Sequence, residues 1–288
     1  MRRRRKPARL LWVAAAVLLG IGGVVVPGAG SAGAVLHRKS DGGPQCGRKE
    51  LTKASGEAWV CTFDEEFNTT SLNRKKWVVQ TTANGSFHLG AACMVDSPNT
   101  VSVSDGHLNL TVRQVARPFR CAMSSGGFST TWDGGSVYTN AFAQTYGRFS
   151  IRALFPDGLG IPGLQSSLWT YPTKRPNIGG LKEIDIAEAY SRWPDYVMPT
   201  VHRAFGANTH NCDMPSFGGK YHTYTLEWSR TAATFYYDGT LCYSTSGVGT
   251  SQLFRVILTQ GLGIRNNAPT LATVKPATMR VDWVRVWK

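Results

Sequence analysis

Apolar and polar residues alternate with a period of two along several short stretches of this chain, a pattern typical of half-buried β-strands. Residues 101–104 and 107–112 both alternate in this way. Asp105-Gly106 lies between them and is a strong signal for a two-residue hairpin turn. The pattern therefore predicts a β-hairpin over residues 101–112.

Further strands are predicted where β-branched, aromatic or alternating apolar residues recur, over residues 149–155, 224–228, 234–237, 240–243 and 279–287. Asp238-Gly239 separates the third and fourth of these runs and predicts another turn. Beyond the N-terminal leader, no stretch of the sequence keeps a helical period over three turns. Many short strands and few helices predict an all-β fold, a β-sandwich of two packed antiparallel sheets.

The N-terminal residues follow a different pattern. Four arginines at positions 2–5 precede an apolar run over residues 10–26, and small residues follow at 31–34. This order predicts a secretory signal peptide over residues 1–34, cleaved near Ala34, and hence a secreted protein without stable membrane insertion. An uncleaved membrane anchor is the alternative, although the run is a little short of the about 20 residues that a span needs. The export route stays open.

After the leader, the chain divides into two parts. Residues 35–58 are rich in Gly, Lys and Ser and are interpreted as a loose lead-in segment. Residues 59–288 have a length that suits a single catalytic domain of the β-sandwich type. The sequence does not specify the oligomeric state, and a monomer is expected.

The charge balance is basic. The formal net charge is +14, and removal of residues 1–34 lowers the number of basic residues from 32 to 26 against 18 acidic ones. Such a balance first suggests nucleic acid as a partner. However, the basic residues are scattered and no nucleic-acid-binding motif occurs, so we expect no nucleic-acid partner. The charge is interpreted as an aid to solubility or to retention near acidic cell-wall polymers.

The six cysteines form no CxxC pair, so the sequence does not indicate a zinc site. In an exported protein they are expected to form disulfides. Six cysteines allow fifteen pairings. Pairing between neighbours in the sequence is the hypothesis taken here: Cys46–Cys61, Cys93–Cys121 and Cys212–Cys242.

One segment carries candidate chemistry: residues 183–188 read Glu-Ile-Asp-Ile-Ala-Glu within a sequence suited to a buried strand. On a regular strand Glu183 and Asp185 share one face, whereas Glu188 falls on the other. A β-bulge near Ile186-Ala187 would return Glu188 to the face of the first two acids. Close carboxylates raise one another's pKa, and glycoside hydrolysis needs one ionised and one protonated carboxylate.

Two other interpretations of this segment are a surface strand and a calcium site. A surface strand usually alternates acids with Lys or Thr, and here Lys182 is the only basic neighbour. A calcium site would need more oxygen ligands close in the sequence. We therefore favour catalysis.

With this motif the chain resembles glycoside hydrolase family 16, the laminarinase-like group, whose bulged branch has the signature Glu-x-Asp-x-x-Glu. The resemblance spans about residues 60–288. It includes the segments 63–68, 99–110, 146–149, 167–169, 221–228, 237–239 and 281–286. The resemblance implies a concanavalin-like jelly roll and an endo-acting enzyme that cleaves a polysaccharide, with a β-1,3- or mixed-linkage glucan as the leading substrate.

The resemblance also implies roles for residues. Glu183 would be the nucleophile, Glu188 the acid and then the base, and Asp185 would tune Glu183 by hydrogen bonding. The candidate substrate-binding residues are Trp169, Tyr190, Trp193, His202 and Asn99, for each of which packing or loop structure is the alternative. No cofactor is expected to be required. Some family members bind calcium away from the cleft, where Asp282 is a candidate, and no metal ligand is assigned.

Two segments depart from the laminarinase-like pattern. Many members carry a Trp-Pro pair just before the acids and an Asn in a late strand, where this chain has residues 179–182 (Gly-Gly-Leu-Lys) and 258–261 (Leu-Thr-Gln-Gly). We therefore expect a substrate pocket that differs from that of a standard laminarinase. The alternative functions are a transglycosylase on the same site and a non-hydrolytic glycan-binding protein. Binding-only relatives typically lose the catalytic acids, and both glutamates are present here.

Overall fold

The computed structural model describes residues 44–48, 50–124, 126–174 and 180–288, and residues 43–288 form one compact unit. The predicted signal peptide, residues 1–34, and the first part of the lead-in segment lie outside the described residues. In the part that is described, no helix is long and apolar enough to cross a membrane.

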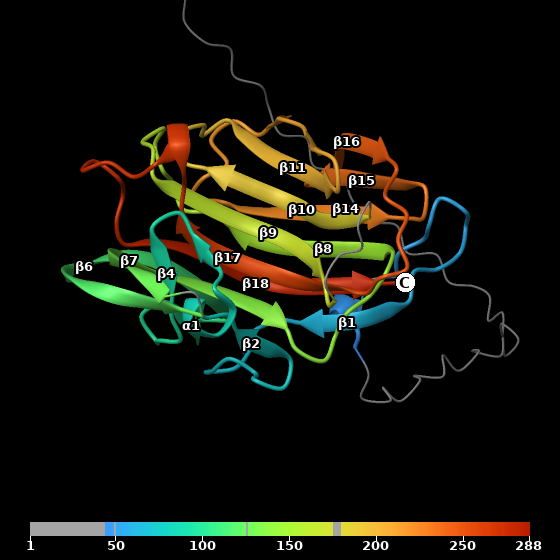
Figure 1. Ribbon diagram of the computed structural model, residues 1–288. Coiled ribbons are helices and arrows are strands. Elements are labelled where there is room, and N and C mark those ends of the chain that lie inside the picture. Colours follow the sequence, from blue (N-terminus) through green and yellow to red (C-terminus); the bar gives the residue numbers. More distant parts are fainter. Residues whose placement is uncertain (1–43, 49, 125, 175–179) are drawn as a thin grey trace, which may run out of the picture. The chain divides into compact units, whose positions relative to one another are not determined.

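The prediction of an all-β fold of antiparallel sheets is confirmed. Figure 1 shows two layers of long strands. One layer, called the cleft sheet here, runs in the order β2 (Trp77–Val79), β7 (Gly126–Thr139), β17 (Phe254–Leu262), β9 (Leu164–Pro172), β10 (Leu181–Tyr190) and β11 (Tyr196–Arg203), with the short β12 (Ala207–Thr209) and β13 (Cys212–Asp213) on β11.

The other layer, the backing sheet, has β18 (Ala277–Trp287) and β8 (Gly147–Leu154) at its centre. Beyond β8 it continues through β14 (Tyr221–Trp228), β15 (Ala232–Tyr237) and β16 (Thr240–Ser246). On the other side, β18 pairs with β1 (Cys61–Glu65) and with β6 (His107–Met123), which pairs with β5 (Val101–Ser104).

The long strands β6 and β7 connect the two sheets. The first part of β6 lies in the backing sheet, its second part pairs with β7, and the last residues of β7 join the cleft sheet. Here β4 (Ala92–Met94) runs parallel to β7 and pairs with β3 (His88–Leu89). The described helices are short: α1 (Thr82–Gly85), η1 (Cys46–Arg48) and η2 (Arg265–Asn267). In the cleft sheet, β10 has a partner strand on each side, β9 and β11, so its acids do not lie on an edge strand.

The apolar core is shared by the two sheets. Phe149 and Ile151 from β8 belong to the same buried cluster as Ile184 and Ile186 from β10, and all four are 0% exposed. Burial of each such side chain contributes about 1.5–3 kcal/mol. The isoleucines of the acidic segment therefore anchor β10 to the core and leave its other face for polar groups.

Both predicted two-residue turns are present. Asp105 and Gly106 have φ of 53° and 75°, and Asp238 and Gly239 have φ of 49° and 81°. Positive φ at both central residues is the type I′ geometry that suits the twist of a hairpin. The turns connect β5 to β6 and β15 to β16, as the alternation of apolar residues predicted.

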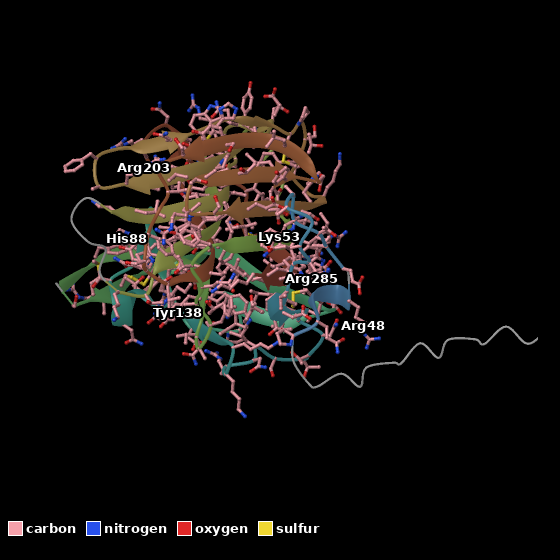
Figure 2. All side chains as sticks on the ribbon, turned by 90° about the vertical axis from the view of Figure 1, so that its right-hand side faces the viewer. Arg48, Lys53, His88, Tyr138, Arg203 and Arg285 are labelled. Carbon is pink, nitrogen blue, oxygen red and sulfur yellow. A yellow bond between two sulfur atoms is a disulfide. The ribbon has the colours of Figure 1, made fainter. Side chains whose placement is uncertain are left out.

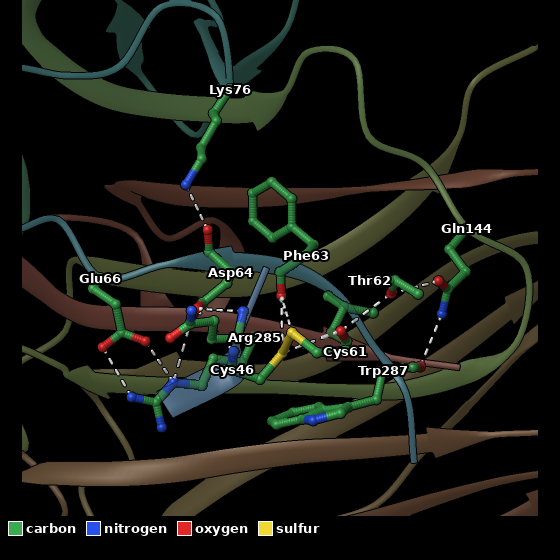
Figure 3. Close-up of a disulfide and its surroundings, with 12 residues drawn as sticks. Cys46, Cys61, Thr62, Phe63, Asp64, Glu66, Lys76, Gln144, Arg285 and Trp287 are labelled. Atoms are coloured by element: carbon green, nitrogen blue, oxygen red, sulfur yellow. Dashed lines mark hydrogen bonds and ion pairs between the residues drawn. A yellow bond between two sulfur atoms is a disulfide. The ribbon is translucent and has the colours of Figure 1, made fainter. Parts of the chain in front are cut away.

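The three predicted disulfides are confirmed: Cys46–Cys61, Cys93–Cys121 and Cys212–Cys242. The first ties the lead-in segment to β1, as Figure 3 shows. Asp64 on β1 also accepts a 2.8 Å hydrogen bond from the backbone N–H of Cys46. Arg285 on β18 binds Glu66 through two hydrogen bonds of 2.7 and 2.9 Å. The disulfide and the hydrogen bond to Asp64 fix Cys46 of this segment to β1.

Candidate active site

The strand β10 contains the predicted bulge. Asp185 pairs with Trp169 on β9, and the next pair is Ala187 with Leu168, so Ile186 is the additional residue. The register against β11 shifts over the same residues, between Asp185 and Glu188. A bulge of one residue reverses the direction of the following side chains. It therefore brings Glu188 to the face of the sheet that carries Glu183 and Asp185.

Asp185 is the most deeply buried of the three acids, with 2% of its surface exposed. Its Oδ2 atom lies 2.9 Å from Nε2 of His202, which stands on the neighbouring strand β11. The same His202 nitrogen lies 3.9 Å from Oε1 of Glu183. His202 is opposite Glu183 in the register of the two strands, which explains why one imidazole reaches both carboxylates.

Glu188 is held by three side chains. Its Oε1 atom accepts hydrogen bonds from Nε2 of Gln165 at 2.8 Å and from the hydroxyl of Ser167 at 3.0 Å. Its Oε2 atom accepts a 2.9 Å hydrogen bond from the hydroxyl of Tyr190. Hydroxyl groups can accept as well as donate, whereas the amide NH₂ of Gln165 only donates. The hydroxyl contacts can therefore persist whether Glu188 is ionised or protonated.

A cleft of about 650 Å³ opens over this face of the sheet, and all three acids line it. Its floor includes Trp169, whose indole N–H donates a 3.1 Å hydrogen bond to the hydroxyl of Thr259 on β17. The ring of Phe87 lies 5.6 Å from that of Trp169. Aromatic side chains beside buried carboxylates give the cleft both flat apolar surfaces and polar groups, the combination that carbohydrate binding requires.

The other predicted substrate-binding residues lie in different places. Tyr190 and His202 contact the acids directly, as described above. Trp193 packs against Tyr190, with ring centroids 6.0 Å apart. Asn99 is exposed in the turn before β5 and is not among the residues that line the cleft. The turn leads into the backing sheet, which explains why Asn99 is away from the acids.

The environment of the three acids raises their pKa values. Burial, followed by the negative charge of Asp185, raises the pKa of Glu183 to about 9. Burial and the charge of Glu188 raise the pKa of Asp185 well above its usual range. Burial also raises the pKa of Glu188, although its hydrogen bonds from Tyr190, Ser167 and Gln165 oppose the rise. Acids this close titrate as a group, so the raised pKa values belong to the site as a whole.

Two places in the structure carry candidate metal ligands. Glu183, Asp185 and His202 offer ligand atoms within 4.8 Å of one another, a set that suits a divalent ion. An ion there would occupy the carboxylate that is predicted to be the nucleophile. Asp282, the candidate calcium ligand, forms an ion pair with Arg152. That pairing with a cation makes the surroundings of Asp282 a poor calcium site.

Sequence reasoning missed Gln165, Ser167, Thr259 and Phe87. The first two occupy alternate positions of β9 together with Trp169, so a polar face on that strand was a usable signal. Thr259 belongs to the segment that departs from the laminarinase-like pattern, and the structure shows its contact with Trp169. Phe87 follows α1 in a loop, and no periodicity connects it with the cleft.

Solved structures with the same fold include a laminarinase and an endo-beta-1,3-glucanase. The laminarinase catalytic domain from Thermotoga maritima has a TM-score of 0.68 and 21% identity, and the alignment covers 81% of this chain and 99% of that one. The endo-beta-1,3-glucanase from Pyrococcus furiosus has a TM-score of 0.70 and 20% identity, with 83% and 97% covered. These similarities confirm the predicted jelly-roll fold.

Curated relatives are more similar in sequence. The glucan endo-1,3-beta-glucosidase A1 of Niallia circulans is 28% identical over 267 residues, which cover 78% of this chain and 37% of the relative. The keratan-sulfate endo-1,4-beta-galactosidase of Sphingobacterium multivorum is 30% identical over 171 residues, or 54% of this chain and 40% of the relative. The chain thus spans about two fifths of the length of these relatives.

The family resemblance noted in the sequence is borne out by a direct match. The sequence profile named "Glycosyl hydrolases family 16" matches residues 90–252, a segment that includes all three acids of β10. Since this segment is more than half of the 288 residues, the chain belongs to glycosyl hydrolases family 16.

Proposed function

We propose that this protein is a secreted, endo-acting glycoside hydrolase that cleaves internal β-linkages of a polysaccharide with retention of configuration. The observation that carries the proposal is the bulge in β10, which puts Glu183 and Glu188 on one face, inside one cleft. Two carboxylates flanking a glycosidic bond are the central requirement of this chemistry.

In the proposed reaction, Glu183 attacks the anomeric carbon while Glu188 gives its proton to the glycosidic oxygen, and the bond between that carbon and oxygen breaks. A covalent glycosyl-enzyme and a shortened polysaccharide result. Glu188, now ionised, takes a proton from water, whose oxygen attacks the anomeric carbon and releases Glu183. The net change is hydrolysis with two inversions.

The neighbours of the two glutamates bear on these roles. Glu183 must be ionised to attack. Burial and Asp185 raise its pKa to about 9, and His202, 3.9 Å away, opposes that rise, so the ionised fraction of this group is the form that attacks. Glu188 must cycle between two protonation states. The hydroxyls of Tyr190 and Ser167 can keep their hydrogen bonds to Glu188 in both protonation states, because each hydroxyl can donate or accept.

The substrate is proposed by analogy with the relatives. Two of them are named a glucan endo-1,3-beta-glucosidase and a keratan-sulfate endo-1,4-beta-galactosidase, and a third relative, from Rhizobium meliloti, is named an endo-1,3-1,4-beta-glycanase. A β-1,3- or mixed-linkage glucan is the leading candidate for this chain. The aromatic floor formed by Trp169 and Phe87 supports a sugar ring at the site.

The test is release of reducing ends by purified residues 35–288 from laminarin, mixed-linkage β-glucan, agarose, carrageenan and xyloglucan. Cleavage in the middle of one polymer, with products of retained anomeric configuration by NMR, is the expected result. Glu183→Gln should lose at least about 10³-fold in kcat while remaining folded. Inverted products, or a Glu183→Gln protein that turns over normally, would remove the basis of the proposal. Transfer to an added sugar acceptor would indicate the transglycosylase.

A further inference from the structure

The cleft extends from the acids toward a basic group on β17. Ile184 on β10 pairs with Thr170 on β9, which pairs with Val256 on β17. Arg255 is therefore two strands away from Glu183 in nearly the same cross-strand row. Adjacent strands are about 4.8 Å apart, so the two backbones are separated by about 10 Å. Both side chains line the same cleft.

Arg255 differs from other half-buried arginines on the strands of this protein. Arg113, Arg148 and Arg152 each form an ion pair with an acid on an adjacent strand. The guanidinium of Arg255 instead lies over the ring of Tyr138 on β7, 4.7 Å from its centroid. Its Nε atom is buried without a hydrogen-bond partner. Within the described residues, no ion pair involves Arg255.

The position of Tyr138 explains how this charge is presented. Figure 2 labels Tyr138, which pairs with Ile257 on β17, so the tyrosine stands next to the arginine across the sheet. Stacking on an aromatic ring fixes the plane of a guanidinium but leaves the N–H groups on its edge free to donate. A planar fork of donors matches an anion with two oxygens, such as a carboxylate or a sulfate ester.

We propose that Arg255, supported by Tyr138, forms a subsite for an acidic substituent on the polysaccharide, either a sulfate ester or a carboxylate. This inference rests on the proposed function, because it assumes that a polysaccharide lies in the cleft. The separation between Arg255 and the three acids determines where a charged substituent can lie. An anionic group beside Glu183 would be repelled, whereas one about 10 Å away meets a cation. The cleft would then accept a polysaccharide, a β-glucan included, that carries an acidic substituent, with the bond that is cut near an unsubstituted sugar.

Binding measured without turnover tests this subsite. The full chain carrying Glu183→Gln is run on native gels that contain laminarin, carboxymethylated laminarin or sulfated laminarin. The same experiment is made after adding Arg255→Met, Arg255→Lys or Arg230→Met. Arg230 is exposed in a turn outside the cleft, so its replacement controls for the loss of one positive charge.

We expect the two acidic polymers to retard the protein more than neutral laminarin does. Arg255→Met should weaken the apparent affinity for them about tenfold or more while leaving that for laminarin unchanged. Arg255→Lys should retain part of the preference for the acidic polymers, and Arg230→Met should retain all of it. If only one of the two acidic polymers retards the protein more than laminarin does, that polymer shows whether the subsite binds a carboxylate or a sulfate ester. Three results would overturn the subsite. They are no preference for the acidic polymers, a loss of affinity with Arg230→Met equal to that with Arg255→Met, and an equal loss of affinity for neutral laminarin with Arg255→Met.

The readout separates this inference from the proposed function. Retardation does not depend on cleavage, so the gels can refute the subsite even if the enzyme hydrolyses laminarin well. Conversely, absence of reducing ends in the panel assay would refute the hydrolase while the gels still report whether Arg255 selects acidic glycans. The two failures therefore have different signatures.

Discussion

The hydroxyl of Tyr190 donates a 2.9 Å hydrogen bond to Oε2 of Glu188, two residues before it on the same strand. Residues two apart share a face of a strand, so this contact follows from the local geometry of β10. The tyrosine hydroxyl therefore contacts the carboxyl group that is proposed to transfer the proton. We therefore expect Tyr190 to position and tune Glu188, while the sugar binding suggested by the sequence stays a prediction.

Tyr190→Phe should lower kcat about 10- to 100-fold with little change in KM. The expected size follows from the loss of one hydrogen bond to a charged group, about 1.5–3 kcal/mol. The bond lowers the pKa of Glu188, so its removal raises that pKa. Since Glu188 must be protonated to act as the acid, the alkaline limb of the kcat/KM profile should move to higher pH.

The check is a pH profile of kcat/KM for the wild type, Tyr190→Phe and Tyr196→Phe. Tyr196 is 37% exposed at the start of β11 and serves as the matched control. Tyr190→Phe with an unshifted alkaline limb would leave the tyrosine with a packing role alone.

Glu183→Gln should make the protein more resistant to unfolding as the pH rises. The folded-state pKa of Glu183 is about 9, above its ordinary value of 4.5, because of burial and neighbouring charge. Between these two values the folded protein binds more protons than the unfolded chain, so the wild type loses stability with increasing pH. The neutral glutamine has no such loss. Hence the difference in Tm between variant and wild type should be small at pH 4.5 and grow toward pH 9.

Thermal unfolding at several pH values measures this difference. Glu227→Gln is a suitable control, since Glu227 is paired with Arg148 on the backing sheet. Equal Tm differences at pH 4.5 and pH 8.5 would show that Glu183 is not held protonated by its surroundings.

Trp169→Phe should raise KM for the polysaccharide about tenfold, because the smaller ring loses stacking surface and leaves the hydroxyl of Thr259 without its indole donor. Thr259→Val removes the same hydrogen bond but keeps the tryptophan ring, so a smaller rise in KM is expected. Initial rates on short oligosaccharides distinguish the two. An equal effect of both variants would mean that the orientation of the indole, and not its area, determines binding.

Much of the fold was accessible from the sequence because its signals are local. The alternation in residues 101–112 and the Asp-Gly pairs at 105–106 and 238–239 specify hairpins within a few residues. The bulge in β10 was also predictable, since three acids on one face require one additional residue. The partners of Glu188 were harder to find. Gln165 and Ser167 lie more than 20 residues away in the sequence, and only the register between β9 and β10 brings them to the glutamate.

Removal of the Cys212–Cys242 disulfide should lower the stability of the whole domain. This bond connects β13 of the cleft sheet to β16 of the backing sheet and encloses 30 residues of sequence. Loop closure of that size corresponds to about 3–4 kcal/mol in the entropic account. The double variant Cys212→Ser/Cys242→Ser should therefore unfold at lower denaturant concentration.

Its kcat should stay near the wild-type value under native conditions, because neither cysteine lines the cleft that holds the acids. Denaturant unfolding and reducing-end assays on the same preparation provide both quantities. A variant with unchanged stability would imply that the two sheets are held by their apolar core alone. A variant that is folded but inactive would imply that this edge of the cleft sheet helps to position β11 and, through His202, the acids.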